Sequence, residues 1–165
     1  MGSIPPLELD EVLLRRVPPS RPECRTIEIR PDGSERVTSV VMSPRSHEEA
    51  LSCSRLRFTT PLDLLANLRQ MSPPIDQTGW KVCCLFVSDI QQIEDGPHGR
   101  LEVLADPRLE PPVDLGHCGI YGAQRTACPR NKLTKKRLAD AARILTPTQM
   151  ETLHSGSTRE EILRS

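Results

Sequence analysis

The sequence contains very few aromatic residues and no long apolar segment. Among its 165 residues there are one Trp, one Tyr and two Phe, so a folded core must consist mainly of Leu, Ile and Val. No run approaches the roughly 18 consecutive apolar residues of a membrane-spanning helix, and the start of the chain has no apolar run of signal-peptide length. We therefore expect a soluble, cytoplasmic protein with no membrane partner.

The chain also lacks net charge and the common catalytic motifs. Its 22 basic and 22 acidic residues cancel, which excludes a general electrostatic attraction to nucleic acid or to anionic membranes. The patterns GxxxxGK[ST], GxGxxG, HExxH and GxSxG are absent, so the usual signatures of phosphate loops, dinucleotide folds, zinc proteases and serine hydrolases are missing. The sequence predicts no cofactor.

Six cysteines are present, but none of them forms a CxxC pair: Cys24, Cys53, Cys83, Cys84, Cys118 and Cys128. Without a secretion signal, we interpret them as reduced thiols. Cys83 and Cys84 lie in the apolar run "WKVCCLFV" and should behave as small buried hydrophobic residues. A metal site from His117, Cys118 and Cys128 is not predicted, because adjacent residues on a strand point to opposite faces.

The order of the segments predicts an α+β fold with a mixed or antiparallel sheet covered by helices. We expect one domain over residues 1–165, with a core of about 7–153 and a short C-terminal helix or tail at 154–165. Apolar runs and alternation predict strands, and Pro-Asp-Gly predicts the turn of a hairpin. The predicted strands are 13–17, a hairpin across 27–41, a central strand at 80–87, and strands at 101–105 and 117–121.

Capping residues predict the helices. Thr60, Pro61 and Asp63 mark a helix that continues to about 71, and Ser88 with Gln91 marks a short one. Helices near 135–153 are expected from a Thr134 cap and from the Thr-Pro-Thr-Gln at 146–149, and Thr158 with Glu161 starts a last one. Residues 42–58 have no clear period, so we expect a loop there with one helical turn at 47–51.

His117, in "DLGHCGIYG", is the main candidate for chemistry. In a structural role, its ring would form a hydrogen bond with a loop carbonyl or with Asp114. This bond would hold the proline-rich segment before His117 in place. In a transferase or hydrolase, His117 would be the general base, and Arg16 or Arg55 would hold an anionic group. An enzyme should gather His117, an arginine and a carboxylate such as Asp114 around one concave pocket.

A second pattern that could form a functional site is a strand with arginines near the start of the chain, followed by a segment with serines. "LLRRVPP" contains Arg15 and Arg16, and "SCSRLRF" contains Ser52, Ser54 and Arg55. This order resembles that of ADP-ribosyltransferase-like enzymes, in which arginine and serine hold the dinucleotide.

The basic segment "RNKLTKKRLADAAR" at 130–143 is the candidate for binding nucleic acid. Lys135, Lys136 and Arg137 are its most closely spaced charges, and Arg130, Lys132 and Arg143 flank them. Such a segment is more often the solvated face of an amphipathic helix. A nucleic-acid interface would need these residues to form one continuous stripe.

The chain contains, in this order, "LLRRVPP", a serine followed by arginine and "TTPLDLL", an apolar strand, "DPRLEPPVDLGHCGI" and a basic helix "KRLADAARIL". In this order of segments, residues 13 to 145 resemble a family of small, uncharacterised bacterial proteins. The resemblance rests on Asp106-Pro107, the proline-rich loop, His117-Cys118-Gly119-Ile120 and the basic helix that follows. It implies an accessory component of a bacterial defence or regulatory system with no established reaction. Our leading hypothesis is therefore a non-enzymatic module that binds another protein, and the enzyme with His117 as general base is the second. The contact surface would be the 106–118 loop, with Asp106, Pro107, His117 and nearby arginines such as Arg15.

Overall fold

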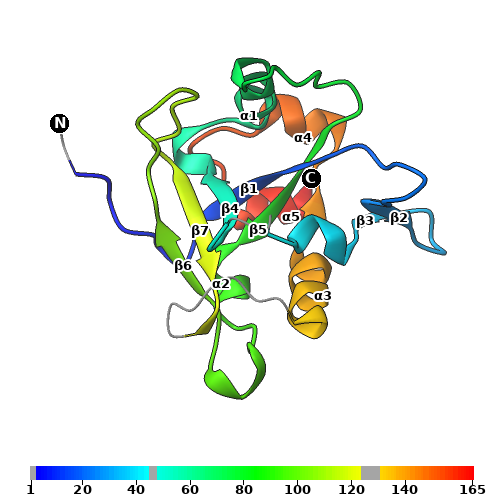
Figure 1. Ribbon diagram of the computed structural model, residues 1–165, viewed down its shortest axis with the longest axis vertical. Coiled ribbons are helices and arrows are strands. Elements are labelled where there is room, and N and C mark those ends of the chain that lie inside the picture. The colour runs from blue at the N-terminus through cyan, green and yellow to red at the C-terminus, as the bar shows by residue number, and fades with distance from the viewer. Residues whose placement is uncertain (1–2, 45–47, 124–130) are drawn as a thin grey trace.

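The centre of the molecule is a six-stranded, wholly antiparallel sheet (Figure 1). The computed structural model describes residues 3–44, 48–123 and 131–165. The strand order is β6-β7-β4-β1-β5-β8. The strands are β1 (Val12–Val17), β4 (Leu51–Arg55), β5 (Lys81–Phe86), β6 (Glu102–Ala105), β7 (His117–Tyr121) and β8 (Arg143–Ile144). The α+β fold predicted from the sequence is thus confirmed, and the sheet is of the antiparallel kind.

Alternation along the strands builds a hydrophobic core on each face of the sheet. On β1, Leu13 and Val17 point into one core, whereas Val12 and Leu14 point into the other. Figure 1 shows α3 (Lys132–Ala141) on one side of the sheet and α1 (Pro61–Ala66) with α4 (Pro147–Thr152) on the other. Because the two cores share one sheet, they form one domain.

Predicted caps begin three of the helices. The Thr60 side chain accepts the amide of Asp63 at the start of α1, and Thr146 forms a reciprocal capping box with Gln149 at α4. Thr158 caps α5 (Arg159–Arg164), as predicted. Ile162 of α5 is 1% exposed, so the hydrophobic core continues beyond residue 153.

The predicted hairpin forms a separate two-stranded ribbon of β2 (Ile27–Ile29) and β3 (Glu35–Val37), which projects from the side of the body (Figure 1). Gly33 in its turn has φ of +85°, a conformation that favours glycine. The second strand was predicted to continue through Val41, but residues 39–42 form a short 3₁₀ helix, η1 (Ser39–Met42). The prediction is wrong there because Val41 and Met42 are buried by packing rather than by pairing.

The largest error of the sequence analysis concerns β4, which was expected to be a loop with a helical turn. Leu51–Arg55 pairs with β1 on one side and with β7 on the other, so it lies inside the sheet. Its serines and arginine hide the apolar signal of a central strand. The remaining short helices are η2 (Leu56–Phe58), η3 (Asn67–Gln70), α2 (Val87–Ile90) and η4 (Gly96–His98).

Two helix starts differ from the predicted ones. α2 begins at Val87 without a side-chain cap, so Ser88 does not cap it. α3 begins at Lys132 and is capped by Asn131, while Thr134 is buried and its hydroxyl donates to Asp95. Asn131 is as good a cap as threonine, and the first turn lacks apolar periodicity, so the sequence alone did not place it. No helix within residues 3–44, 48–123 and 131–165 is long and apolar enough to cross a membrane.

Candidate functional site

β1 and β4 separate in the middle of the sheet, and Arg15 fills the gap between them. Their pairing is limited to Leu13 opposite Arg55 and Leu14 opposite Ser54. Beyond this point the Arg15 guanidinium donates to the main-chain carbonyl of Val41 at 2.8 Å and to that of Ser52 at 2.5 Å. The positive charge of Arg15 is therefore held in place by neutral carbonyl groups.

His117, Ser54 and Arg16 lie on the same face of three neighbouring strands. Ser54 of β4 is opposite His117 of β7 and Leu14 of β1, and Arg16 follows Leu14 by two residues. The amide of Arg55 donates to Gly116 O beside the Ser54–His117 pair. This bond identifies a non-hydrogen-bonded pair, in which the two side chains approach each other most closely.

These side chains line a cavity of about 730 Å³, which lies in the range of small-molecule sites. α1 and η3 supply part of its wall through Leu64 and Leu68. The charged and polar lining near β4 and β7 comprises Arg15, Arg16, Arg108, Asp114, His117 and the hydroxyls of Ser52 and Ser54. The structure thus gathers a histidine, arginines and a carboxylate around one hollow.

The tautomer of His117 follows from its contact with the loop. Nδ1 lies 2.8 Å from the main-chain oxygen of Asp106, and because a carbonyl only accepts, neutral His117 carries its proton on Nδ1. Nε2 then has a lone pair, is buried, and has no hydrogen-bond partner among the described residues. A buried ring nitrogen without a partner on the wall of a cavity is a site for a hydrogen bond from a ligand.

Burial keeps the pKa of His117 below its ordinary value of 6.5. The loss of solvation is the largest cause, and the positive charge of Arg108 adds to it, against the opposing effects of Asp106 and Asp114. The Asp106 carboxylate is 3.4 Å from Nδ1. His117 is therefore neutral near pH 7, in the form that can accept a proton at Nε2.

Asp114 fastens the 106–116 loop to the sheet. Its carboxylate accepts the Ser54 hydroxyl at 2.5 Å and the Gly116 amide at 3.0 Å. Its main chain pairs with that of Arg108 through two hydrogen bonds of 2.8 and 3.0 Å, which close the proline-rich tip into a small loop. These contacts bring Arg108 to the cavity beside His117.

The structure separates the two arginines that were expected to hold an anion. Arg16 lines the cavity and donates to the carbonyl of Leu64 at 3.2 Å. Arg55 is fully buried, its guanidinium is bonded to Glu11, and it does not line the cavity. Of the two arginines, only Arg16 is therefore in a position to hold an anion in the cavity. The side chain of Arg55 faces away from Ser54 and is part of the core.

The remaining predicted site residues lie around the loop. Arg15 lines the cavity, Asp106 contacts the His117 ring, and Pro107 is exposed outside the lining. The loop-carbonyl contact predicted for a structural His117 is also present, and His117 is among the residues that line the cavity. The arginine and serine strands singled out by the ADP-ribosyltransferase-like order are neighbours, β1 and β4, and the activity itself stays a prediction.

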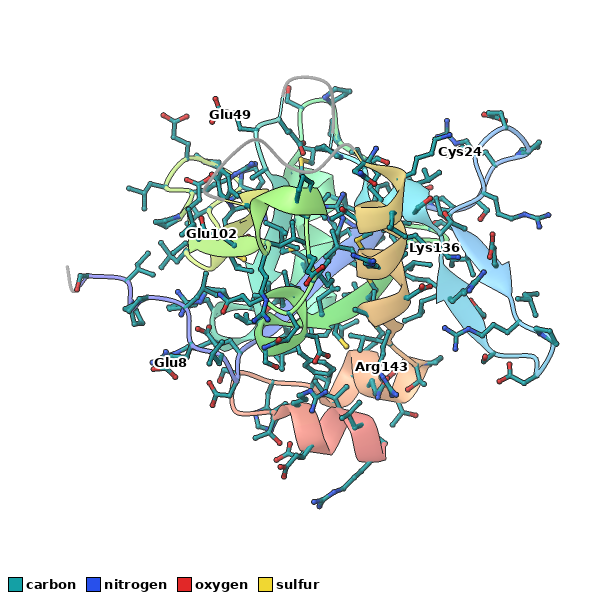
Figure 2. All side chains as sticks on the ribbon, turned by 90° about the horizontal axis from the view of Figure 1, so that it is seen from below. Glu8, Cys24, Glu49, Glu102, Lys136 and Arg143 are labelled. Carbon is teal, nitrogen blue, oxygen red and sulfur yellow. The ribbon has the colours of Figure 1, made fainter. Side chains whose placement is uncertain are left out.

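The basic residues of α3 lie away from this cavity. Figure 2 shows Lys136 on α3 and Arg143 just beyond the end of that helix. Lys136 and Arg137 are exposed. The helix also carries Asp140, which lies 3.8 Å from Arg36 of β3, so its charge is not uniformly positive. Arg130 of the predicted basic segment and Cys128 of the cysteine set lie outside the described residues.

Arg108 and Trp80 are two of the lining residues that the sequence did not predict as part of a site. Arg108 lies in the loop between β6 and β7, and only the closure of that loop by Asp114 brings it to His117. Trp80, the single tryptophan of the chain, precedes β5 and was predicted as the first residue of the central strand at 80–87. Its position next to the arginine-bearing β1 depends on strand pairing, which periodicity does not predict.

Comparison of the chain with protein-family models, with curated proteins and with solved structures finds no match. The resemblance to a bacterial family therefore stays a prediction. Within the described parts of the chain, no three His, Cys, Asp or Glu side chains are arranged to hold a metal ion.

Proposed function

We propose that the protein is an enzyme, a transferase or hydrolase, that binds a phosphate-bearing substrate in the cavity and uses His117 as general base. The observation that carries the proposal is that His117 lines the same cavity as Arg15 and Arg16, and that its buried Nε2 has no hydrogen-bond partner among the described residues. A base must have a lone pair at the reacting centre, and Nε2 has one because Asp106 O takes the Nδ1 proton.

The arginines of the cavity support the proposal that the substrate carries a phosphate. A guanidinium presents five donors in a fixed plane that matches phosphate oxygens. Arg15 uses donors on Nε and Nη1 for main-chain carbonyls, and among the described residues it forms no ion pair with a carboxylate. Four carboxylates also line the cavity, so the attraction for an anion is local to the arginines rather than a property of the whole cavity.

The test is turnover by the purified full-length chain. Candidate phosphate monoesters, diphosphates and nucleotides are incubated with the protein, and products are followed by mass spectrometry. We expect one of them to be consumed, and His117→Gln to reduce the rate by about 10²- to 10⁴-fold, the usual contribution of a general base. His154→Gln, at an exposed histidine outside the cavity, is the matched control. Equal rates in the native chain and His117→Gln contradict the proposed role.

A protein-interaction module, accessory to a bacterial defence or regulatory system, is the second candidate. It is favoured by three apolar side chains exposed on or beside the tip of the 106–116 loop: Leu109, Val113 and Leu115, which are 64%, 52% and 43% exposed. Affinity capture from the host should recover a protein partner with the native chain. Capture that is unchanged by a Leu109→Ser, Val113→Ser double substitution and by His117→Ala argues against this surface.

A further inference from the structure

The end of the cavity away from His117 combines several apolar residues with the only tryptophan of the chain. Trp80 is partly exposed, packs with Met71 and Ile75 against the core, and shares the cavity wall with both of them. Pro18 and Pro19 line the cavity beside them. A ring with apolar neighbours and an open side is suited to contact a flat ligand group.

The register places this end next to the arginines. Arg16 is opposite Val82, and Trp80 precedes Val82 by two residues, so Trp80 points to the same face as Arg16 and is its diagonal neighbour. Across the sheet the same face carries Arg16, Ser54 and His117 in that order. A flat group that lies on Trp80 therefore has the positive charge of Arg16 beside it. His117, the proposed base, lies further along the same face of the sheet.

The span between the two ends limits the size of the ligand. Three strand spacings separate β7 from β5, about 14 Å at the usual distance between strands. Trp80 also lies four residues beyond Cys84, the residue of β5 that is level with His117, which adds about 13 Å along the strand and places the two backbones about 20 Å apart. A free phosphate does not reach from Trp80 to His117, and neither does a free nucleobase. A ligand that joins a planar base to phosphates through a sugar does.

We propose that the substrate is a nucleotide whose base lies against Trp80, Met71 and Ile75, whose phosphates lie at Arg16, and whose reacting group faces His117. This rests on the proposed function and specifies its substrate class. Asp76 and Thr78 at the same end are engaged with each other, through the Thr78 hydroxyl and amide, and supply polar atoms at the edge of the base site.

The experiment compares nucleoside diphosphates with inorganic pyrophosphate. The four common ones, ADP, GDP, CDP and UDP, are titrated into the full-length chain by calorimetry and by the emission of Trp80, which no other tryptophan obscures. We expect at least one to bind about tenfold or more tightly than pyrophosphate, as base stacking on an aromatic ring provides, and to change the emission.

Variants separate the two ends of the site. Trp80→Leu should reduce the binding of that nucleotide to the level of pyrophosphate, whereas Trp80→Phe keeps a ring and most of the preference. Arg16→Gln should weaken nucleotide and pyrophosphate together. Each variant is first checked for a native circular dichroism spectrum and cooperative melting, and Trp80→Phe supplies the comparison where Trp80→Leu does not fold.

Two results overturn the inference in different ways. If pyrophosphate binds as tightly as every nucleotide and Trp80 emission does not change, the nucleotide assignment is wrong while the phosphate site of the proposed function stands. If neither pyrophosphate nor any nucleotide binds, both the nucleotide assignment and the phosphate-binding part of the proposed function are wrong.

Discussion

Arg55 and Glu11 form a bidentate ion pair, with Nε to Oε1 at 2.6 Å and Nη2 to Oε2 at 2.7 Å. The side chain of Arg55 is completely buried and that of Glu11 is 7% exposed. The same guanidinium donates to the carbonyls of Pro5 and Pro6, so it ties the N-terminal segment to β4. Ser54 and Arg55 are consecutive residues, yet one faces the cavity and the other anchors the chain.

Breaking this pair should be costly. Glu11→Gln or Arg55→Met leaves one buried charge without its partner, and we expect a loss of about 3–5 kcal/mol in the free energy of unfolding. Urea denaturation measures it. Arg57→Met, at the exposed arginine two residues away, is the control and should change stability little. A single substitution of Glu11 that leaves the unfolding midpoint unchanged contradicts the anchoring role.

The buried His117 should make the protein sensitive to acid. Because its pKa in the folded state is lower than the ordinary 6.5, the unfolded chain binds the proton more readily. Its contribution to stability is complete above about pH 6.5 and is lost as the pH falls through the lowered pKa of the folded state. His117→Gln should therefore lose less stability on acidification than the native chain.

Two measurements check this pH dependence. Urea unfolding of the native chain and of His117→Gln at neutral and at acidic pH compares the loss of stability, and NMR titration of the ring carbons gives the pKa of His117 directly. A folded-state pKa above 6.5, or an identical loss in both proteins, is inconsistent with the burial seen here.

The hydrogen bond from Ser54 to Asp114 should hold the 106–116 loop closed. A bond to a charged group contributes about 1.5–3 kcal/mol, so Ser54→Ala should lower the free energy of unfolding by that order and speed amide exchange at Gly116. Ser52→Ala is the matched control on the same strand, since the Ser52 hydroxyl makes no hydrogen bond among the described residues. Equal exchange rates in both variants would falsify the role of Ser54 in holding the 106–116 loop closed.

The buried thiols should be unreactive in the native protein. Loss of solvation raises the pKa of Cys53 and of Cys84 to about 11, and it also raises the pKa of Cys83 and Cys118. Cys24 is partly exposed on the side of the molecule near the β2–β3 hairpin (Figure 2). In a Cys128→Ser background, iodoacetamide at about pH 8 should label Cys24 and leave the other four unmodified until denaturant is added. Mass spectrometry of tryptic peptides identifies the labelled residues.

The sequence predicted those elements that are specified by residues close to one another in the chain. The Thr60, Thr146 and Thr158 caps, the Pro-Asp-Gly hairpin and the apolar strand at 81–86 were all confirmed, because each depends on residues within a few positions of one another. β4 was not predicted, because its residues become strand-like only between β1 and β7.

The sequence by itself determined that the chain folds as α+β around an aliphatic core, that His117 stands at the start of a strand, and that arginines precede a serine segment. Only the tertiary structure decided which arginine faces the cavity, since strand alternation sends Arg16 and Arg55 to different environments. It also brought Arg108 and Trp80 to the site, through the closure of a loop and the register of β1 with β5. These contacts join residues distant in the chain, and for that reason no local pattern contains them.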